Sequence, residues 1–278
     1  MDVKRVEEAV AKSLMGLSAL LVAASLGAVL IVVLVRGLPA LTLSMLTQVP
    51  RGGYYLGGEG GVLNAIVGSL CLAGGATVLA LVISLPIVLY QQKEYGGRTA
   101  LAGLTRLALD VMWGIPSIVY GAFGFALMLY LGLRASLLGG IIALTFVELP
   151  IMARATQEVV KMIPAELKEA SYALGATRLE TASKVVWRYA LPGTLTAILL
   201  AFGRGVGDAA SVLFTAGFTD RLPSSLTEPV ASLPLAVFFQ IGTPFPEVQQ
   251  RAYASAVILL MVVLTLSLLC RLLSKASD

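Results

Sequence analysis

Long apolar stretches constrain this chain more than any other feature of its sequence. A transmembrane helix needs about 20 mainly apolar residues, and six stretches reach or approach that length. Because a bilayer offers no water to backbone groups, spans of this length are helices. The sequence therefore predicts an all-α membrane protein with six transmembrane helices in a single domain, residues 1–278. The six stretches are Leu14–Val35, Val62–Tyr90, Leu107–Leu133, Leu137–Ala153, Leu191–Gly217 and Ala252–Leu273.

Composition agrees with a membrane protein and excludes several kinds of chemistry. The chain is 58% hydrophobic and 13% charged, whereas soluble domains are roughly half apolar and about a quarter charged. It contains no histidine, so imidazole metal sites, Ser-His triads and imidazole proton relays are excluded. The phosphate-binding pattern G-x-x-x-x-G-K-[ST] of ATPases is also absent from the sequence. We therefore expect a chain that is not an enzyme and that holds no metal or cofactor.

Lysine and arginine are distributed unequally between the two sides of the predicted bundle. Basic residues in short loops mark the cytoplasmic side of a membrane protein. Fourteen of the 20 lysines and arginines lie at the termini or in the second and fourth connections, and five lie in the other loops. We therefore expect a multi-pass protein of the cell (plasma or inner) membrane with both termini in the cytoplasm. The net charge of +4 then reflects orientation rather than nucleic-acid binding.

Two charged residues, Arg204 and Asp208, lie within the fifth apolar stretch, four residues apart. A charge at the bilayer centre costs roughly 2.5–3.5 kcal/mol on insertion scales, and such residues are usually sheltered and functional. On a helix this spacing places both side chains on one face, and the guanidinium fork suits an oxyanion. Gly203, Gly205 and Gly207 leave room beside them. Two interpretations stay open: a structural ion pair, or an anion station on a translocation path.

The connection between the fourth and fifth stretches, about residues 154–190, is the only long polar segment on the predicted cytoplasmic side. Pro164 suits the first turn of a helix, and Gly175 suits its end because glycine tolerates positive φ. Thr177 and Glu180 form a capping-box pattern that starts a second helix. Such a pair of short helices either docks into a partner's groove or lies solvated on the membrane surface.

One motif in this connection resembles a known family. Residues 169–171, Glu-Ala-Ser, followed after three residues by Gly175, look like the EAA---G motif of ABC-importer permeases, with Ser171 in place of the second alanine. In that family the loop forms coupling helices that occupy a cleft of the cytoplasmic ATPase subunit. The resemblance implies the type I (MetI-like) ABC-importer permease architecture, and it assigns ATPase docking to Glu169, Ala170 and Gly175.

Four longer blocks are similar to the permeases of phosphate importers, and the run Leu213–Ala216 is typical of the PstA-type subunit rather than the PstC-type. The resemblance implies a permease that moves inorganic phosphate into the cytoplasm. It also implies a PstC-type permease as heterodimer partner, separate ATPase subunits and an extracytoplasmic phosphate-binding protein. The four blocks are Gly114–Leu127, Leu149–Pro164, Ala170–Arg178 and Gly203–Gly217.

The same resemblance implies a substrate pathway at Arg204, Asp208, Gly203 and Gly207, which match an Arg-x-x-Gly-Glu pattern of phosphate permeases with Asp208 in place of glutamate. We hypothesise that Arg204 presents a transient positive site and that Asp208 keeps phosphate from binding too tightly. Asp208 would also accept a hydrogen bond from a protonated phosphate hydroxyl, which sulfate lacks at neutral pH.

Two further carboxylates, Asp110 and Glu148, are expected near the cytoplasmic interface, where they cap a helix or pair with loop cations; an inner gate stays open as an alternative. Segments Arg36–Gly61 and Phe218–Arg251 are expected outside the cell, the second with a short helix at Pro234–Ile241. These outer loops either receive the binding protein or serve only as connectors.

Three other functions compete with phosphate import. The first is a permease of the same architecture for molybdate, tungstate or sulfate. The second is a stand-alone ion-coupled carrier or channel, which would usually show an internal repeat that we do not find in this sequence. The third is a membrane enzyme, for which the sequence offers no catalytic constellation.

Overall fold

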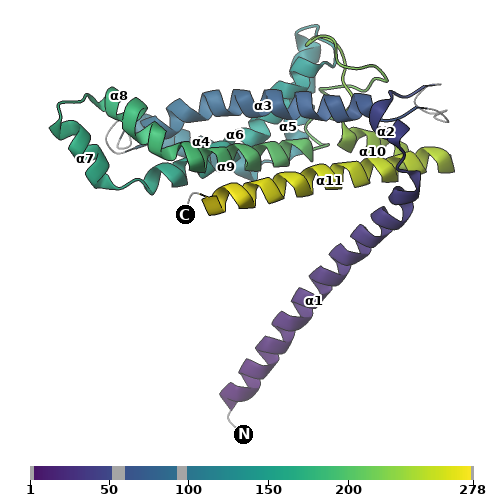
Figure 1. Ribbon diagram of the computed structural model, residues 1–278, viewed down its shortest axis with the longest axis horizontal. Helices are drawn as coiled ribbons and strands as arrows, with labels where there is room; N and C mark the ends of the chain where they lie inside the picture. Colours follow the sequence, from purple (N-terminus) through teal and green to yellow (C-terminus); the bar gives the residue numbers. More distant parts are fainter. Residues whose placement is uncertain (1–2, 52–59, 93–98, 277–278) are drawn as a thin grey trace.

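The computed structural model describes residues 3–51, 60–92 and 99–276. Most of the predicted glycine- and tyrosine-rich outer segment at 50–61 lies outside the described residues. The described chain is built of helices joined by loops (Figure 1). In chain order they are α1 (Val3–Gly37), η1 (Leu38–Ala40), α2 (Leu43–Thr47), α3 (Leu63–Tyr90), α4 (Ala100–Gly114), α5 (Ser117–Tyr130), α6 (Leu137–Lys161), α7 (Ala165–Ala173), α8 (Arg178–Glu180), η2 (Thr181–Val186), α9 (Trp187–Val206), α10 (Leu233–Ile241) and α11 (Pro246–Ala276).

Helices α3, α6, α9 and α11 form the bundle that carries the core. Helix α3 packs against both α6 and α9, and α9 packs against α11 (Figure 1). Small residues on α3, such as Ala73 and Ala76, are fully buried and let α6 approach closely. Leu72 and Leu144 fill the space between these two helices. This close packing positions the middle of α6 beside the end of α9.

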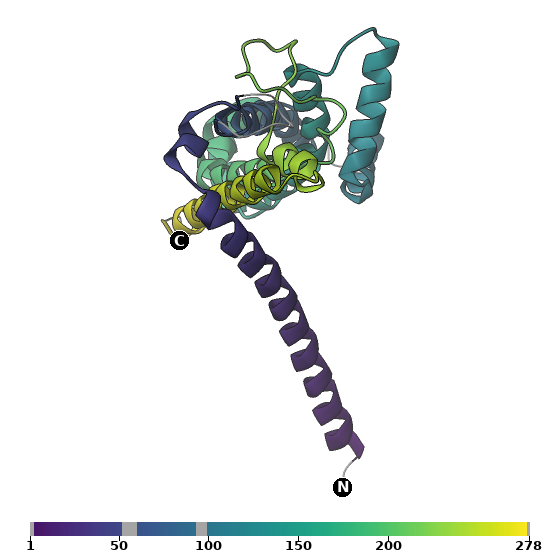
Figure 2. The same cartoon turned by 90° about the vertical axis from the view of Figure 1, so that its right-hand side faces the viewer.

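Helix α1 leaves the bundle and projects away from it over most of its length (Figures 1 and 2). Its apolar side chains are exposed, and its contacts with the bundle are made at its C-terminal end, against α11 and η1. There Arg36 Nη1 donates a hydrogen bond of 3.1 Å to the hydroxyl of Tyr253, over whose ring the guanidinium lies. An apolar helix this long and this exposed requires lipid or another protein around it.

Five described helices are long and apolar enough to cross a membrane, or six if α4 and α5 are counted as one broken span. The expectation of one continuous helix at Leu107–Leu133 is therefore wrong, because α4 and α5 are bent by 104° at Ile115–Pro116. The residue before a proline is pushed away from the α conformation, and Ile115 is accordingly extended, with φ −78° and ψ 126°.

Other predicted boundaries also move. The fourth stretch was expected to end at Ala153, but α6 continues to Lys161 in spite of the internal Pro150. The fifth was expected to stay helical to Gly217, but helix α9 ends at Val206. At its other end α9 continues back through η2 to Arg178 without a break. The predicted short helix at Pro234–Ile241 is confirmed as α10.

Candidate functional site

The two charges of the fifth stretch form an ion pair at the end of α9. Arg204 Nη1 lies 2.6 Å from Asp208 Oδ2. The two side chains differ in access, since that of Arg204 is 44% exposed and that of Asp208 only 2%. Arg204 occupies the last turn of the helix, and Asp208 lies just beyond it. A guanidinium has five N–H donors, so an Arg204 held on one side by Asp208 keeps donors for a further acceptor.

Asp208 also fixes the way in which the chain leaves the helix. Its backbone N–H donates to Gly205 O at 3.1 Å, and its Oδ1 accepts a hydrogen bond of 2.8 Å from Ser211 N. Aspartate commonly makes such local side-chain to backbone bonds, which compete with a continuing helix. Asp208 is therefore not on a helix face, as its spacing suggested, but holds Arg204 from the first turn of an irregular segment.

The segment that follows, residues 207–232, is non-helical and runs against the bundle. Backbone that is not helical is tolerated at membrane depth only where protein satisfies its polar groups. Here the carbonyl of Thr215 accepts from Ser136 N at 2.8 Å, and the carbonyl of Ala216 accepts from Val230 N at 3.0 Å. At the end of the segment, Leu233 N donates to Ser69 Oγ on α3 at 2.8 Å. Earlier parts of the chain and the segment itself thus supply hydrogen-bond partners for its backbone.

The three glycines beside Arg204 have two different functions in the packing. A methyl group at Gly203 would meet nothing within 4 Å, and one at Gly207 would touch only backbone oxygens of α9, the nearest at 3.8 Å. These two glycines therefore leave space beside Arg204. A methyl group at Gly205 would instead overlap the carboxylate of Glu148. Gly205 is therefore a point of close contact between α6 and α9.

Sequence reasoning placed Glu148 at the interface end of its span, and this placement is wrong. Because α6 continues to Lys161, Glu148 lies near the middle of the helix and is fully buried. Its Oε2 accepts a hydrogen bond of 2.7 Å from Thr77 Oγ1 on α3. Its Oε1 lies against Gly205, the residue that follows Arg204 in α9. The sequence held a signal that could have identified Glu148 as a site residue. It is an acidic residue inside an apolar stretch, which in a membrane protein marks a candidate functional site.

Asp110 occupies a different environment from Glu148. It lies within α4 and is ion-paired with Arg154 of α6, both side chains being about half exposed. Asp110 thus pairs with a cation as expected, but the cation lies on α6 and not in a loop. The pair lines an open cavity of about 570 Å³ where α4 and α6 meet the end of α3.

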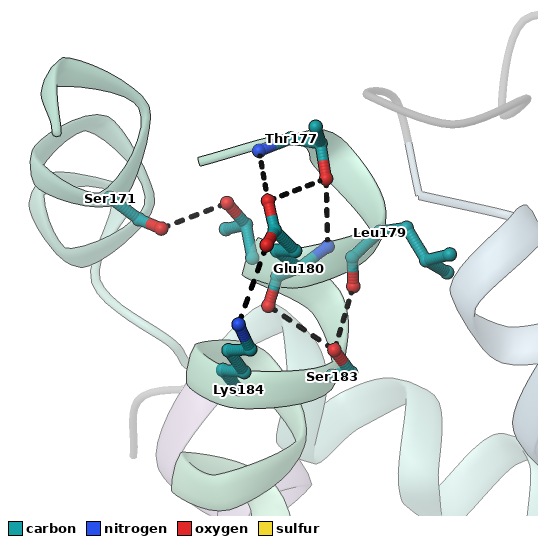
Figure 3. Close-up of polar contacts among 7 residues, drawn as sticks. Ser171, Thr177, Leu179, Glu180, Ser183 and Lys184 are labelled. Carbon is teal, nitrogen blue, oxygen red and sulfur yellow. Dashed lines mark hydrogen bonds and ion pairs between the residues drawn. The ribbon is translucent and has the colours of Figure 1, made fainter. Parts of the chain in front are cut away.

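The predicted helical hairpin of the polar connection is present (Figure 3). Pro164 directly precedes α7, and Gly175 has φ +81° just after the C-cap residue of α7. Thr177 and Glu180 form the complete capping box: Thr177 N donates to Glu180 Oε2 at 3.0 Å, and Glu180 N donates to Thr177 Oγ1 at 3.3 Å. The two helix starts and the glycine turn read from the sequence are therefore confirmed, but the second helix is not short, because it continues through η2 into α9.

The two arms of the hairpin are joined by a hydrogen bond of 2.9 Å between the hydroxyls of Ser171 and Thr181 (Figure 3). Glu169, Ala170 and Gly175, the residues of the EAA-like motif, are all exposed. Leu174 and Leu179 at the turn are 89% and 77% exposed. Exposed leucines on a rigid turn, at the end of the molecule, are typical of a protein-binding surface.

The fold is shared with solved transporters. A chain of the methionine ABC transporter MetNI, in an inward-facing conformation, superposes with a TM-score of 0.62 at 19% identity, over 78% of this chain and 95% of that one. A chain of an amino acid ABC transporter gives a TM-score of 0.59 at 18% identity, over 77% and 92%. The architecture is therefore that of the type I (MetI-like) ABC-importer permeases, as the sequence predicted.

Sequence comparison places the chain within a family. The family model described as "Binding-protein-dependent transport system inner membrane component" matches residues 96–278. The chain therefore belongs to this family of inner-membrane transport components.

Several relatives of this chain carry the same protein name, PstA. The "Phosphate transport system permease protein PstA" of Yersinia pestis is 34% identical over 238 residues, which is 86% of this chain and 80% of the relative. The protein of the same name from Haemophilus influenzae is 32% identical over 88% of this chain and 85% of its own. PstA 1 of Mycobacterium tuberculosis is 37% identical over 75% and 69%. The predicted resemblance to PstA-type permeases is thus confirmed.

Proposed function

We propose that this chain is the PstA-type permease subunit of an ATP-driven importer that moves inorganic phosphate into the cytoplasm. The relatives that carry the phosphate-transport name cover most of the chain. The observation in this molecule that carries the proposal is the half-exposed guanidinium of Arg204, which lies in the last turn of the otherwise apolar helix end of α9, with open space at Gly203 and Gly207. A guanidinium with unused N–H donors, on an otherwise apolar part of a helix, suits an oxyanion that passes through.

Asp208 holds Arg204 and limits its attraction for the anion. The sequence also suggested that Asp208 accepts a hydrogen bond from a phosphate hydroxyl. Its burial and its two existing bonds, to Arg204 and to Ser211 N, favour the holding function instead. A carboxylate 2.6 Å from the guanidinium offsets part of its positive charge. Weak binding is what a pathway needs, because an anion that binds too tightly does not leave.

ATP hydrolysis belongs to separate subunits, and the hairpin of α7 and α8 is the surface that docks them. Glu169, Ala170 and Gly175 are exposed on it, beside the exposed Leu174 and Leu179. The capping box and the bond between Ser171 and Thr181 keep the turn rigid. A rigid hairpin transmits the closing motion of an ATPase pair to α9, with which it is continuous through η2.

A second permease of the PstC type completes the pathway as a heterodimer. This chain supplies one charged site, open on one side, and its α1 projects away from its own bundle (Figure 2). Membrane lipid and the second permease would cover α1. An extracytoplasmic phosphate-binding protein would deliver the anion at the loops around α2 and α10, and both termini would lie in the cytoplasm.

Reconstitution tests the function directly. The chain would be purified with its partner permease and ATPase subunits and placed in liposomes with each candidate binding protein. We expect ATPase stimulation and radiolabelled uptake with phosphate-loaded binding protein, at rates well above those with sulfate, molybdate or tungstate. Uptake of one of these other oxyanions in preference to phosphate would assign the chain to that substrate. Transport without any ATPase subunit would contradict the importer assignment altogether.

A further inference from the structure

Glu148 is a fully buried acid in the middle of a membrane-spanning helix, and the proposed transport function does not yet use it. Its Oε2 accepts the hydroxyl hydrogen of Thr77 at 2.7 Å. Its Oε1 has no hydrogen-bond partner among the described residues. This oxygen is directed at Gly205, where any side chain would overlap it. The packing of α6 on α9 therefore encloses a carboxyl oxygen that has no hydrogen-bond partner among the described residues. This oxygen lies at Gly205, the residue that follows Arg204.

No cation neutralises Glu148 at contact distance. Among the described residues its side chain has no ion pair, and Arg204 is paired with Asp208 instead. Gly205, against which Glu148 packs, lies between Arg204 and Asp208 in the chain, so these two are the charged residues next to the contact. Burying a carboxylate without a paired cation is costly, so the neutral acid is favoured here.

The other helices packed on α6 bring no charge to Glu148. Helix α3 contributes Thr77 and carries no charged residue. Helix α4 has Arg106 and Asp110, but Asp110 pairs with Arg154, six residues or about 9 Å further along α6.

Helix α5 carries a titratable phenol, that of Tyr120, which packs against α6. Tyr120 stacks on the ring of Phe146 and donates its hydroxyl hydrogen to Met112 O at 2.9 Å. Arg204 and Asp208 are therefore the charges that face Glu148.

We propose that Glu148 is a proton-binding member of the Arg204–Asp208 site, and that its charge state sets how firmly Arg204 holds an anion. This inference rests on the proposed function of phosphate import. With Glu148 neutral, the positive charge of Arg204 is offset by Asp208 alone. With Glu148 ionised, a second negative charge acts on the same guanidinium, and an anion there is repelled. Glu148 is thus a positioning residue that acts through Arg204, taking its proton from water and returning it there.

Glu148→Gln tests the proposal, because glutamine keeps the shape and the acceptor for Thr77 but is always neutral. Uptake of radiolabelled phosphate would be measured for wild-type and variant complexes in proteoliposomes, from about pH 6 to about pH 8. The rate of the variant is divided by that of wild type at each pH. This ratio removes the effect that the ionisation of phosphate itself has on both rates. We expect a ratio near one at the acid end, where wild type is also neutral. At the alkaline end we expect the variant to be several-fold slower, because it retains the anion.

A matched control and a second variant make the test specific. Glu158→Gln removes a carboxylate from the same helix at an exposed position, where it pairs with Lys161, and its ratio should not change with pH. Thr77→Val removes the donor that stabilises the charged form, so the pH at which uptake changes should move upward. If the Glu148→Gln complex fails to assemble, the pH dependence of Thr77→Val tests the proposal in its place.

The outcomes separate this inference from the proposed function. A wild-type complex that does not transport phosphate at any pH contradicts the proposed function. A wild-type complex that transports phosphate, with a Glu148→Gln ratio constant over the whole pH range or changing in the opposite sense, overturns the inference and leaves the function intact. A constant deficit would mean that Glu148 serves only the packing of α6 on α9.

Discussion

Gly205 of α9 lies against the carboxylate of Glu148 on α6, so closely that any side chain at position 205 would overlap Oε1. Two glycines on the same helix thus have opposite surroundings, because Gly203 faces open space. The contrast shows that a run of glycines around a charge does not have one explanation. One clears room beside the guanidinium, and another admits a buried acid.

Gly205→Ala should destabilise the protein by about 1–3 kcal/mol, the usual cost of forcing extra volume into a packed interior. Gly203→Ala is the matched control, since alanine there meets nothing and glycine within a helix costs about 0.5–1 kcal/mol relative to alanine. Thermal unfolding of the purified complexes in detergent measures both variants. Equal melting temperatures for the two would contradict the described contact between α6 and α9.

Arg204→Gln should reduce phosphate uptake about ten- to a hundred-fold in complexes that assemble normally. Hydrogen bonds to charged groups contribute roughly 1.5–3 kcal/mol each, and about 1.4 kcal/mol corresponds to a factor of ten. Arg204→Lys should retain part of the rate, because it keeps the charge but loses the planar fork. Arg221→Gln, in the exposed loop after the site, is the control. Uptake at the wild-type rate by Arg204→Gln would remove this residue from the pathway.

Asp208→Asn should lower both stability and uptake without changing the preference for phosphate over sulfate. The substitution weakens the ion pair with Arg204, but the Asp208 side chain is 2% exposed and already bonded at both oxygens. Competition of unlabelled sulfate against labelled phosphate measures the preference. A preference that falls several-fold would instead show that Asp208 contacts the substrate, as its sequence context suggested.

Leu174→Glu should prevent stable association with the ATPase subunits while leaving the membrane domain folded. The side chain is 89% exposed, so its replacement costs the isolated chain little, whereas a charge in an apolar docking groove remains unpaired. Co-purification of the ATPase with tagged permease provides the measurement. Leu222→Glu, in a loop at the other end of the bundle, is the control. Retention of the ATPase by Leu174→Glu would argue against docking through this hairpin.

Local signals in the sequence predicted the local structure well. The hairpin after α6 depends on the capping box at Thr177, the glycine at 175 and the proline at 164, each of which acts over a few residues. Hydropathy likewise located the bundle helices. The break at Pro116 was not predicted, because proline is compatible with both a continuous membrane helix and a broken one. Packing around the break decides between them.

The charged site was predicted in part. The spacing of Arg204 and Asp208 left a structural ion pair and an anion station open, and the ion pair is present. The end of α9 between them was missed, because apolar residues continue through a segment that is buried but not helical. Glu148 was misplaced for a related reason, since its helix continues beyond the apolar stretch. Hydropathy measures how apolar a stretch is, and neither the path of the backbone nor the depth of a residue follows from it.

The irregular segment after α9 also has a consequence for how the protein is made. Its backbone binds to Ser69 on α3 and to Ser136 at the start of α6, and both precede it in the chain. A ribosome synthesises those parts of the chain first, so both hydrogen-bond partners are already in the chain when Asp208 is added. The segment therefore does not depend on α11, which is synthesised last, for these two hydrogen bonds.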